Sequence, residues 1–117
     1  FLTGRFRSPA DLPEGDTRAE RFPRFSEDNW DANLRIVERV EELARRREVT
    51  PGQVALAWVL SRGADVVPIP GTKTLRYLEE NVDAANVVFE PGDLDWLEDN
   101  MVPAAGARYS DMSHVSR

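Results

Sequence analysis

VVPIPGTKTLRYLEEN, residues 66–81, is the stretch that most constrains the fold. Its apolar first half predicts a short strand over residues 65–70, the Gly-Thr-Lys step at 71–73 predicts a turn, and the periodic apolar residues that follow predict a helix over residues 74–85. The first turn of a helix carries unpaired amides and the positive end of the helix dipole, which together favour an anion. This strand–turn–helix therefore predicts a phosphate site, and we expect a nucleotide there.

The composition limits the kinds of protein that can carry such a site. The 117 residues suit one domain with one modest core. A net charge of -6 disfavours non-specific binding to nucleic acid or to an anionic membrane, and we expect neither as a partner. The sequence has no Cys, which excludes disulfides and thiolate zinc sites, and we expect no metal site. No apolar run reaches the ~20 residues of a membrane-spanning helix, and we expect a cytoplasmic protein.

Two helices are expected over residues 26–63. Ser26 is placed to cap the first, which has apolar residues at helical spacing up to about Arg47. Thr50-Pro51-Gly52-Gln53 begins the second, because it offers a capping box and a proline at the first helical position. The body of this second helix, VALAWVL at 54–60, is apolar on nearly all sides and should be buried on more than one face.

The remaining segments are an extra helix and two irregular ends. Pro91-Gly92-Asp93 precedes an apolar pattern that predicts a helix over residues 91–101. Residues 1–25 are rich in Gly, Pro and charge and predict a long surface loop, and residues 103–117 predict a tail. We expect the chain to be a piece of something longer, because its opening residues are apolar and do not begin with Met.

Several of these segments resemble one known family. TPGQVALAWVL at 50–60, PIPGTK at 68–73 and LEEN at 78–81 look like the C-terminal part of an aldo-keto reductase. FPRF at 22–25, followed by Asn29 and Asn33, further resembles the auxin-induced-protein-like and bacterial pyridoxal-reductase-like branch.

The resemblance implies an α/β fold, the C-terminal part of a (β/α)8 TIM barrel that is mostly helical in this excerpt with one clear strand. Residues 1–25 would be the loop after strand 7, 65–70 strand 8, 74–85 helix 8, and 91–101 the extra C-terminal helix. In such barrels a phosphate site is often built from the loops after strands 7 and 8. The implied activity is NADPH-dependent reduction of aldehydes or ketones to alcohols, with a small-molecule carbonyl substrate in the intact enzyme.

The resemblance also assigns roles to individual residues. Gly71 and Thr72 would donate hydrogen bonds to the 2'-phosphate of NADPH, and Lys73 would supply the counter-charge. Tyr77 stands where many relatives place Arg or Gln, so Arg76 is the candidate for a second cation. On the same grounds Glu80 and Asn81 would hold the adenine edge, and Leu2 and Gly4 would lie in the loop along the pyrophosphate.

Each of these residues has a plainer explanation. Gly71 permits a turn after Pro70, and Thr72 or Thr74 suits an ordinary N-cap. Glu80 suits a solvated helix face, and Asn81 suits a polar residue inside a helix with a local hydrogen bond to the backbone. Lys73 is the most specific signal, because the helix dipole disfavours a cation at a helix start unless an anion is present.

Two other functions are kept open. The family's Asp-Tyr-Lys-His catalytic set has no counterpart here, and His114, the only His, is expected to be a surface residue, so no catalytic residue is assigned. The chain is then the cofactor-binding part of an enzyme or a truncated non-catalytic fragment, with exposed apolar faces that favour self-association. The alternative from another class is a small helical binding module resembling a helix-turn-helix, which the acidic charge disfavours.

Overall fold

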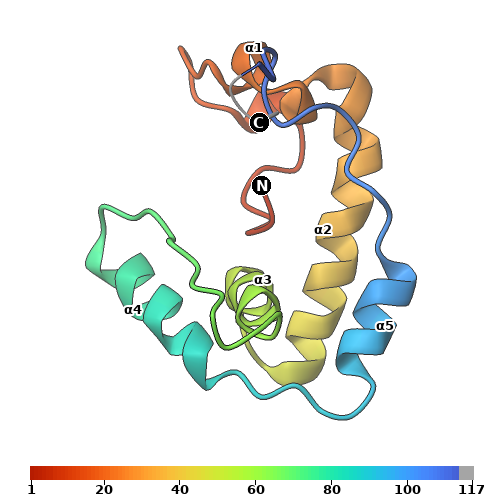
Figure 1. The fold of residues 1–117 in the computed structure, drawn as a ribbon. Helices are drawn as coiled ribbons and strands as arrows, with labels where there is room; N and C mark the ends of the chain where they lie inside the picture. Colours follow the sequence, from red (N-terminus) through yellow and green to blue (C-terminus); the bar gives the residue numbers. More distant parts are fainter. Residues whose placement is uncertain (114–117) are drawn as a thin grey trace.

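The structure, a computed structural model, describes residues 1–113. His114 lies outside the described residues. Within this range every regular element is helical (Figure 1). In chain order they are η1 (Pro9–Asp11), α1 (Arg18–Arg21), η2 (Pro23–Phe25), α2 (Glu27–Arg47), α3 (Pro51–Leu60), α4 (Leu75–Asp83), η3 (Ala84–Asn86) and α5 (Asp93–Asn100).

The long helix α2 contacts η2, α3 and α5, and it packs against them through one apolar stripe. Its buried residues recur at helical spacing and are Trp30, Asn33, Ile36, Val37, Val40, Leu43 and Ala44. Ser26 occupies the N-cap, but its hydroxyl donates to the Pro23 carbonyl oxygen at 2.8 Å and does not cap a helix amide. The helix ends where Glu48 adopts a left-handed conformation with φ of 55°.

The start of α3 forms the capping box that its sequence predicts. The Gln53 amide donates to Thr50 Oγ1 at 3.2 Å, and Gln53 Oε1 accepts from the Thr50 amide at 2.9 Å. Pro51 follows at the first helical position, where its missing N–H is not needed. These contacts fix the entry to α3 and bury Gln53 beside Val54.

The core lies where α3 and α5 pack against the C-terminal half of α2, with α4 outside α3 (Figure 1). Its buried members are Val40, Leu43, Ala44, Val54 and Leu97. Partly buried side chains surround them, including both Trp58 and Trp96. Burial of this cluster stabilises the fold by about 25 cal/mol for each Å² of apolar surface removed from water.

Residues 65–70 do not form the expected strand, so the prediction of one clear strand is wrong for the described chain. A strand is defined by a ladder of hydrogen bonds to a neighbouring strand, and residues 1–113 offer no such neighbour. Pro68 and Pro70 also lack an amide hydrogen. Val67 and Ile69 consequently lie open to solvent, 76% and 94% exposed.

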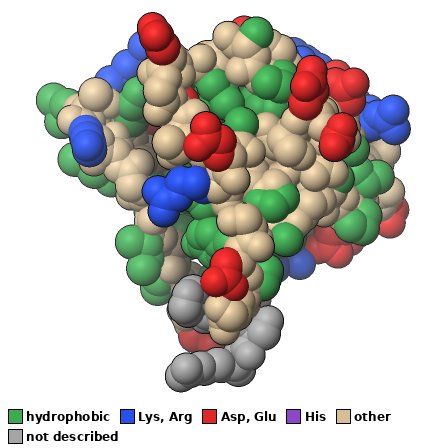
Figure 2. Space-filling view, turned by 90° about the horizontal axis from the view of Figure 1, so that it is seen from above, with side chains coloured by type: hydrophobic (Ala, Val, Ile, Leu, Met, Phe, Trp, Pro, Cys, Tyr) green, Lys and Arg blue, Asp and Glu red, His purple; other side chains and the backbone are tan. Residues whose placement is uncertain are grey.

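The helix expected over residues 74–85 is divided between α4 and η3. None of the nine described residues of α4 is buried, whereas Ala84 in η3 is 1% exposed. Leu75, Leu78 and Val82 form an exposed apolar stripe on α4. Figure 2 shows hydrophobic side chains lying open on one face of the molecule among acidic and basic ones.

Residues 1–25 are not the bare loop that the composition predicts, because they contain η1, α1 and η2. Pro9 and Pro23 begin the two 3-10 turns, for which their fixed φ is suited. The segment is held to α2 by Trp30, whose Nε1 donates to the Arg7 carbonyl oxygen at 2.9 Å and whose ring lies 5.9 Å from that of Phe1.

The chain after α5 returns along α2 and is fixed there by Asn33 (Figure 1). Asn33 is 1% exposed, and its Nδ2 donates to the carbonyl oxygens of Arg24 at 3.0 Å and Ala105 at 2.9 Å. Its Oδ1 accepts from the Ala105 amide at 2.7 Å. The beginning of the predicted tail is therefore packed on the helix.

Candidate functional site

The turn at residues 71–74 leads into the exposed start of α4. Thr72 Oγ1 accepts from the Thr74 amide at 3.3 Å and donates to the Thr74 carbonyl oxygen at 3.2 Å. Thr74 is the N-cap residue, but its side chain makes no capping hydrogen bond. The amides of the first turn of α4 are thus left without a side-chain partner.

The charge at this helix start is positive. Lys73 is exposed and makes no ion pair within residues 1–113, and Arg76 follows in the first turn with its guanidinium 5.8 Å from the centre of the Tyr77 ring. The described first turn of α4 carries no acidic side chain. Two cations, uncapped amides and the helix dipole therefore favour an anion at this point.

Glu80 and Asn81 lie about one and a half turns beyond the start of α4, and Glu80 contacts residues at the start of α3. Glu80 Oε1 accepts from Thr50 Oγ1 at 2.8 Å, and the Glu80 carbonyl oxygen accepts from Gln53 Nε2 at 3.2 Å. Asn81 is half-buried beside a large open hollow. A carboxylate and an amide thus follow each other in the sequence at this point of α4, and these two groups can pair with both donors and acceptors of a flat polar ring.

The hollow has a volume of about 840 Å³ and lies between the N-terminal segment, α2, α3 and the chain after α5. Of the residues that the resemblance assigns to the cofactor, it brings together Leu2, Gly71 and Asn81. The others, namely Gly4, Thr72, Lys73, Tyr77 and Glu80, are not among its lining residues. The structure therefore divides the expected residues: Leu2, Gly71 and Asn81 line the hollow, and Thr72, Lys73 and Tyr77 lie at the start of α4. Glu80 contacts the start of α3, and Gly4 packs on α2.

Gly4 is explained by packing on α2. Its φ is +69°, and a Cβ there would lie 2.5 Å from Glu41 Oε1 and 3.4 Å from Val37 Cγ1. Gly71 is different, because no atom lies within 4 Å of a Cβ built on it. A glycine is required at position 4 by the fold, while at position 71 the surroundings leave its backbone open to approach.

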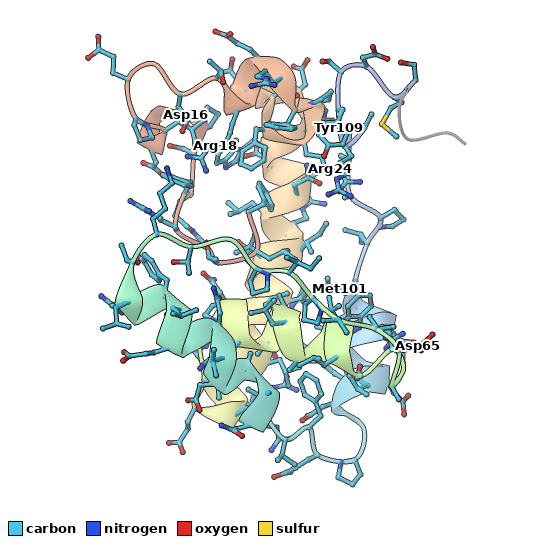
Figure 3. All side chains as sticks on the ribbon, turned by 60° about the vertical axis from the view of Figure 1, so that its left-hand side comes forward. Asp16, Arg18, Arg24, Asp65, Met101 and Tyr109 are labelled. Carbon is cyan, nitrogen blue, oxygen red and sulfur yellow. The ribbon has the colours of Figure 1, made fainter. Side chains whose placement is uncertain are left out.

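Sequence reasoning missed the residues at the far rim of the hollow. Arg18, Arg24 and Tyr109 line it, and Figure 3 shows them gathered near the N-terminal end of α2, away from Asp65. The Tyr109 ring lies 5.5 Å from that of Phe22. The motif FPRF at 22–25 was a signal for this rim, whereas Tyr109 comes from a distant segment that no local pattern connects to it.

Arg18 is held by an acidic neighbour and by aromatic rings. Its Nε and terminal nitrogen bond Asp16 at 2.9 and 2.5 Å (Figure 3). Hydrogen bonds from the Arg18 side chain and backbone lower the pKa of Asp16. The guanidinium also lies 4.5 Å from the centre of the Phe6 ring. Arg18 is thus a fixed part of the rim, while Arg24 makes only a 3.4 Å hydrogen bond to the Gly106 carbonyl oxygen.

Residues 1–113 contain no group of three or more acidic, His or Cys side chains that could hold a metal ion. No helix within them has the length and apolar character needed to cross a membrane.

Three curated proteins are similar to this chain in sequence. An aldo-keto reductase of Schizosaccharomyces pombe named yakc, with NADP(+) in its name, is 42% identical over 111 residues, which are 93% of this chain and 32% of that protein. Aldo-keto reductase str7 of Strobilurus tenacellus is 44% identical over 74% of this chain and 26% of its own length. A probable aldo-keto reductase of Glycine max is 44% identical over 80% of this chain and 28% of its own length.

The chain spans about a third or less of the length of these curated relatives. A model of the aldo/keto reductase family matches residues 1–99, which include the turn at 71–74, all of α4 and most of α5. The chain therefore belongs to the aldo/keto reductase family.

Proposed function

We propose that this chain forms the part of an aldo-keto reductase barrel that binds the adenosine end of NADPH, in an enzyme that reduces aldehydes or ketones to alcohols. The observation that carries the proposal is the exposed, uncapped and positively charged start of α4, with Glu80 and Asn81 further along the same helix. The relative named with NADP(+), 42% identical to this chain, supports the choice of cofactor.

The donor set fits the two ends of an adenosine 2'-phosphate. Amides, the Thr72 hydroxyl and Lys73 suit a phosphate, and Arg76 offers the second cation. The Glu80 carboxylate and the Asn81 amide suit the exocyclic amino group and ring nitrogens of adenine. Leu75 and Glu80 are five residues apart, which is about 7.5 Å along a helix at 1.5 Å per residue. The helix start and the Glu80–Asn81 pair therefore offer separate contacts for the phosphate and for the adenine.

Bound NADPH would supply a hydride to the carbonyl carbon of the substrate. The residues of this chain would bind and orient the cofactor, with Leu2 beside its pyrophosphate, Tyr77 against the nucleotide, and Lys73 balancing the charge of the 2'-phosphate. The hollow is the proposed location of the carbonyl substrate, since its apolar lining and the rim residues Arg24 and Tyr109 provide a surface for a small organic molecule.

The helical binding module has less support. A helix-turn-helix joins its two helices by a turn of ~3–4 residues. Here α3 ends at Leu60 and α4 begins at Leu75, so residues 61–74 separate them.

The test is a calorimetric titration of the chain with adenosine 2',5'-bisphosphate and with adenosine 5'-monophosphate. The proposal predicts that the bisphosphate binds more tightly, and that Lys73→Ala weakens its binding by about tenfold or more, as expected for loss of a charge-assisted hydrogen bond. Arg45→Ala is the matched control, because Arg45 is an exposed cation at the far end of α2. Equal binding of both nucleotides, or equal loss in the two variants, would contradict the 2'-phosphate assignment.

A further inference from the structure

The Thr50 hydroxyl joins two helices by using both of its hydrogen-bonding capacities. As an acceptor it caps α3, receiving the Gln53 amide at 3.2 Å. As a donor it bonds Glu80 Oε1 on α4 at 2.8 Å. Glu80 is one of the two residues proposed to hold adenine, and Thr50 lies thirty positions before it in the sequence. The cap of one helix is therefore also a contact to the candidate binding residue of another.

Neighbouring groups hold the Glu80 side chain in the same place. Gln53, itself buried, donates from Nε2 to the Glu80 carbonyl oxygen at 3.2 Å, which fixes the backbone of α4 at this point. Gly52 lets the carboxylate come close, because a Cβ there would lie 3.3 Å from Glu80 Oε1. Only Oε1 is used by Thr50, and Oε2 has no hydrogen-bond partner within the described chain.

We infer that Thr50 is a positioning residue for the adenine contact: it holds one oxygen of Glu80 so that the other is presented to the exocyclic amino group of the base. The inference rests on the proposed function, because it assigns a role to a residue that acts through Glu80. A carboxylate fixed before binding loses less rotamer freedom when the ligand arrives, which is the physical benefit of the contact. The role requires a group that accepts and donates at once, and a hydroxyl does both.

The variant Thr50→Asp separates positioning from capping. Asp is among the best N-cap residues, so α3 keeps its cap, but the new carboxylate cannot donate to Glu80 and repels it. Thr50→Ser keeps both hydrogen bonds and serves as the conservative rescue. Gly52→Ala is a second, independent variant: its Cβ would lie 3.3 Å from Glu80 Oε1, so the carboxylate must shift by a few tenths of an ångström, while the Thr50 cap stays at ordinary contact distance. Glu79→Gln is the matched control, an exposed carboxylate on the same helix.

The readout is the preference of the chain for adenosine 2',5'-bisphosphate over inosine 2',5'-bisphosphate, which differ at the exocyclic amino group. We expect the wild-type chain to prefer adenosine by about tenfold, and Thr50→Asp and Gly52→Ala to reduce this preference towards one while inosine binding changes little. Thr50→Ser and Glu79→Gln should keep the wild-type preference for the adenosine nucleotide. Circular dichroism of each variant identifies any that has lost its helices. If Thr50→Asp is unfolded, the nucleotide preference of Gly52→Ala tests the inference instead.

The outcomes separate this inference from the proposed function. If the wild-type chain binds neither nucleotide, the proposed function fails and the inference fails with it. If it binds adenosine preferentially but Thr50→Asp and Gly52→Ala keep the preference, the inference alone is overturned. Equal weakening of both nucleotides in folded variants would also overturn it, because that result indicates a structural role only.

Discussion

Two glycines assigned to the cofactor differ in what the fold requires of them. Gly4 has φ of +69°, and a Cβ there would push aside the end of the Glu41 side chain, whereas Gly71 does not have positive φ and has open space around it. Gly4→Ala should lower the free energy of unfolding by about 1–2 kcal/mol or more in the absence of any nucleotide, because a residue with a Cβ is strained in the left-handed region. Gly71→Ala should change it by less than about 0.5 kcal/mol and should instead weaken binding of adenosine 2',5'-bisphosphate, where a methyl group blocks close approach. Urea unfolding and calorimetry of both variants measure this contrast, and similar stability losses at the two positions would refute it.

At the scale of elements, an ion pair adds to the apolar packing between α2 and α5. Arg47 at the end of α2 bonds both oxygens of Asp93 at the start of α5, at 2.6 and 2.8 Å. Burial acts to raise the pKa of Asp93, but the hydrogen bonds from Arg47 and from the Glu90 amide outweigh it and leave the pKa lowered. Because the folded pKa lies below the unfolded value of about 3.9, the contribution is complete above that pH and is lost as pH falls through the folded pKa. Asp93→Asn should therefore lower the free energy of unfolding by about 1.5–3 kcal/mol at pH 7. The difference in this free energy between the variant and the wild type should shrink below about pH 4. Urea unfolding between pH 2 and 7 tests this range, and a difference that stays constant with pH would contradict the assignment.

The elements also show which parts of the fold a sequence can predict. Capping residues and helical spacing lie within a few positions of each other, so the starts of α2 and α3 are predictable from local sequence. Thr50 makes the capping contact that its position predicts, whereas Ser26 stands at the N-cap of α2 without making one. A strand is a relation between distant segments, and the apolar pattern at residues 65–70 does not supply the neighbour that its hydrogen bonds need. The short helices in residues 1–25 were missed because each is no longer than about one turn and carries no periodic signal.

On the scale of the whole molecule, Asn33 joins the N-terminal segment and the chain after α5 to α2, and its bond to Ala105 spans 72 positions of the sequence. It bonds the backbones of Arg24 and Ala105 from a position that is 1% exposed. Asn33→Asp keeps the shape but replaces a donor with a charged acceptor facing two carbonyl oxygens, and it should destabilise the fold by about 1–3 kcal/mol. It should also speed hydrogen exchange of the Ala105 amide. The same change at Asn100, whose exposed side chain donates only to the Trp96 carbonyl oxygen, is the control. Equal effects of the two variants on the unfolding midpoint would contradict this role.

The candidate site follows the same division between local and distant information. Gly71, Thr72 and Lys73 are neighbours in the sequence, and their resemblance to a family segment identified them together. Two contacts depend on how distant segments pack, namely Thr50 with Glu80 and Tyr109 with Phe22. No sequence motif predicts either contact. The structure adds these contacts because it brings together segments that are 30 to 87 positions apart.

The central claim, that the start of α4 holds an adenosine 2'-phosphate, is tested most directly at Lys73, the only lysine of the chain. The measurement is the rate at which an amine-reactive reagent acetylates Lys73, followed by mass mapping, with and without saturating nucleotide. Adenosine 2',5'-bisphosphate should slow the acetylation of Lys73, because the phosphate pairs with its ammonium group, while adenosine 5'-monophosphate should not. An unchanged rate with the bisphosphate, or equal protection by both nucleotides, would contradict the account.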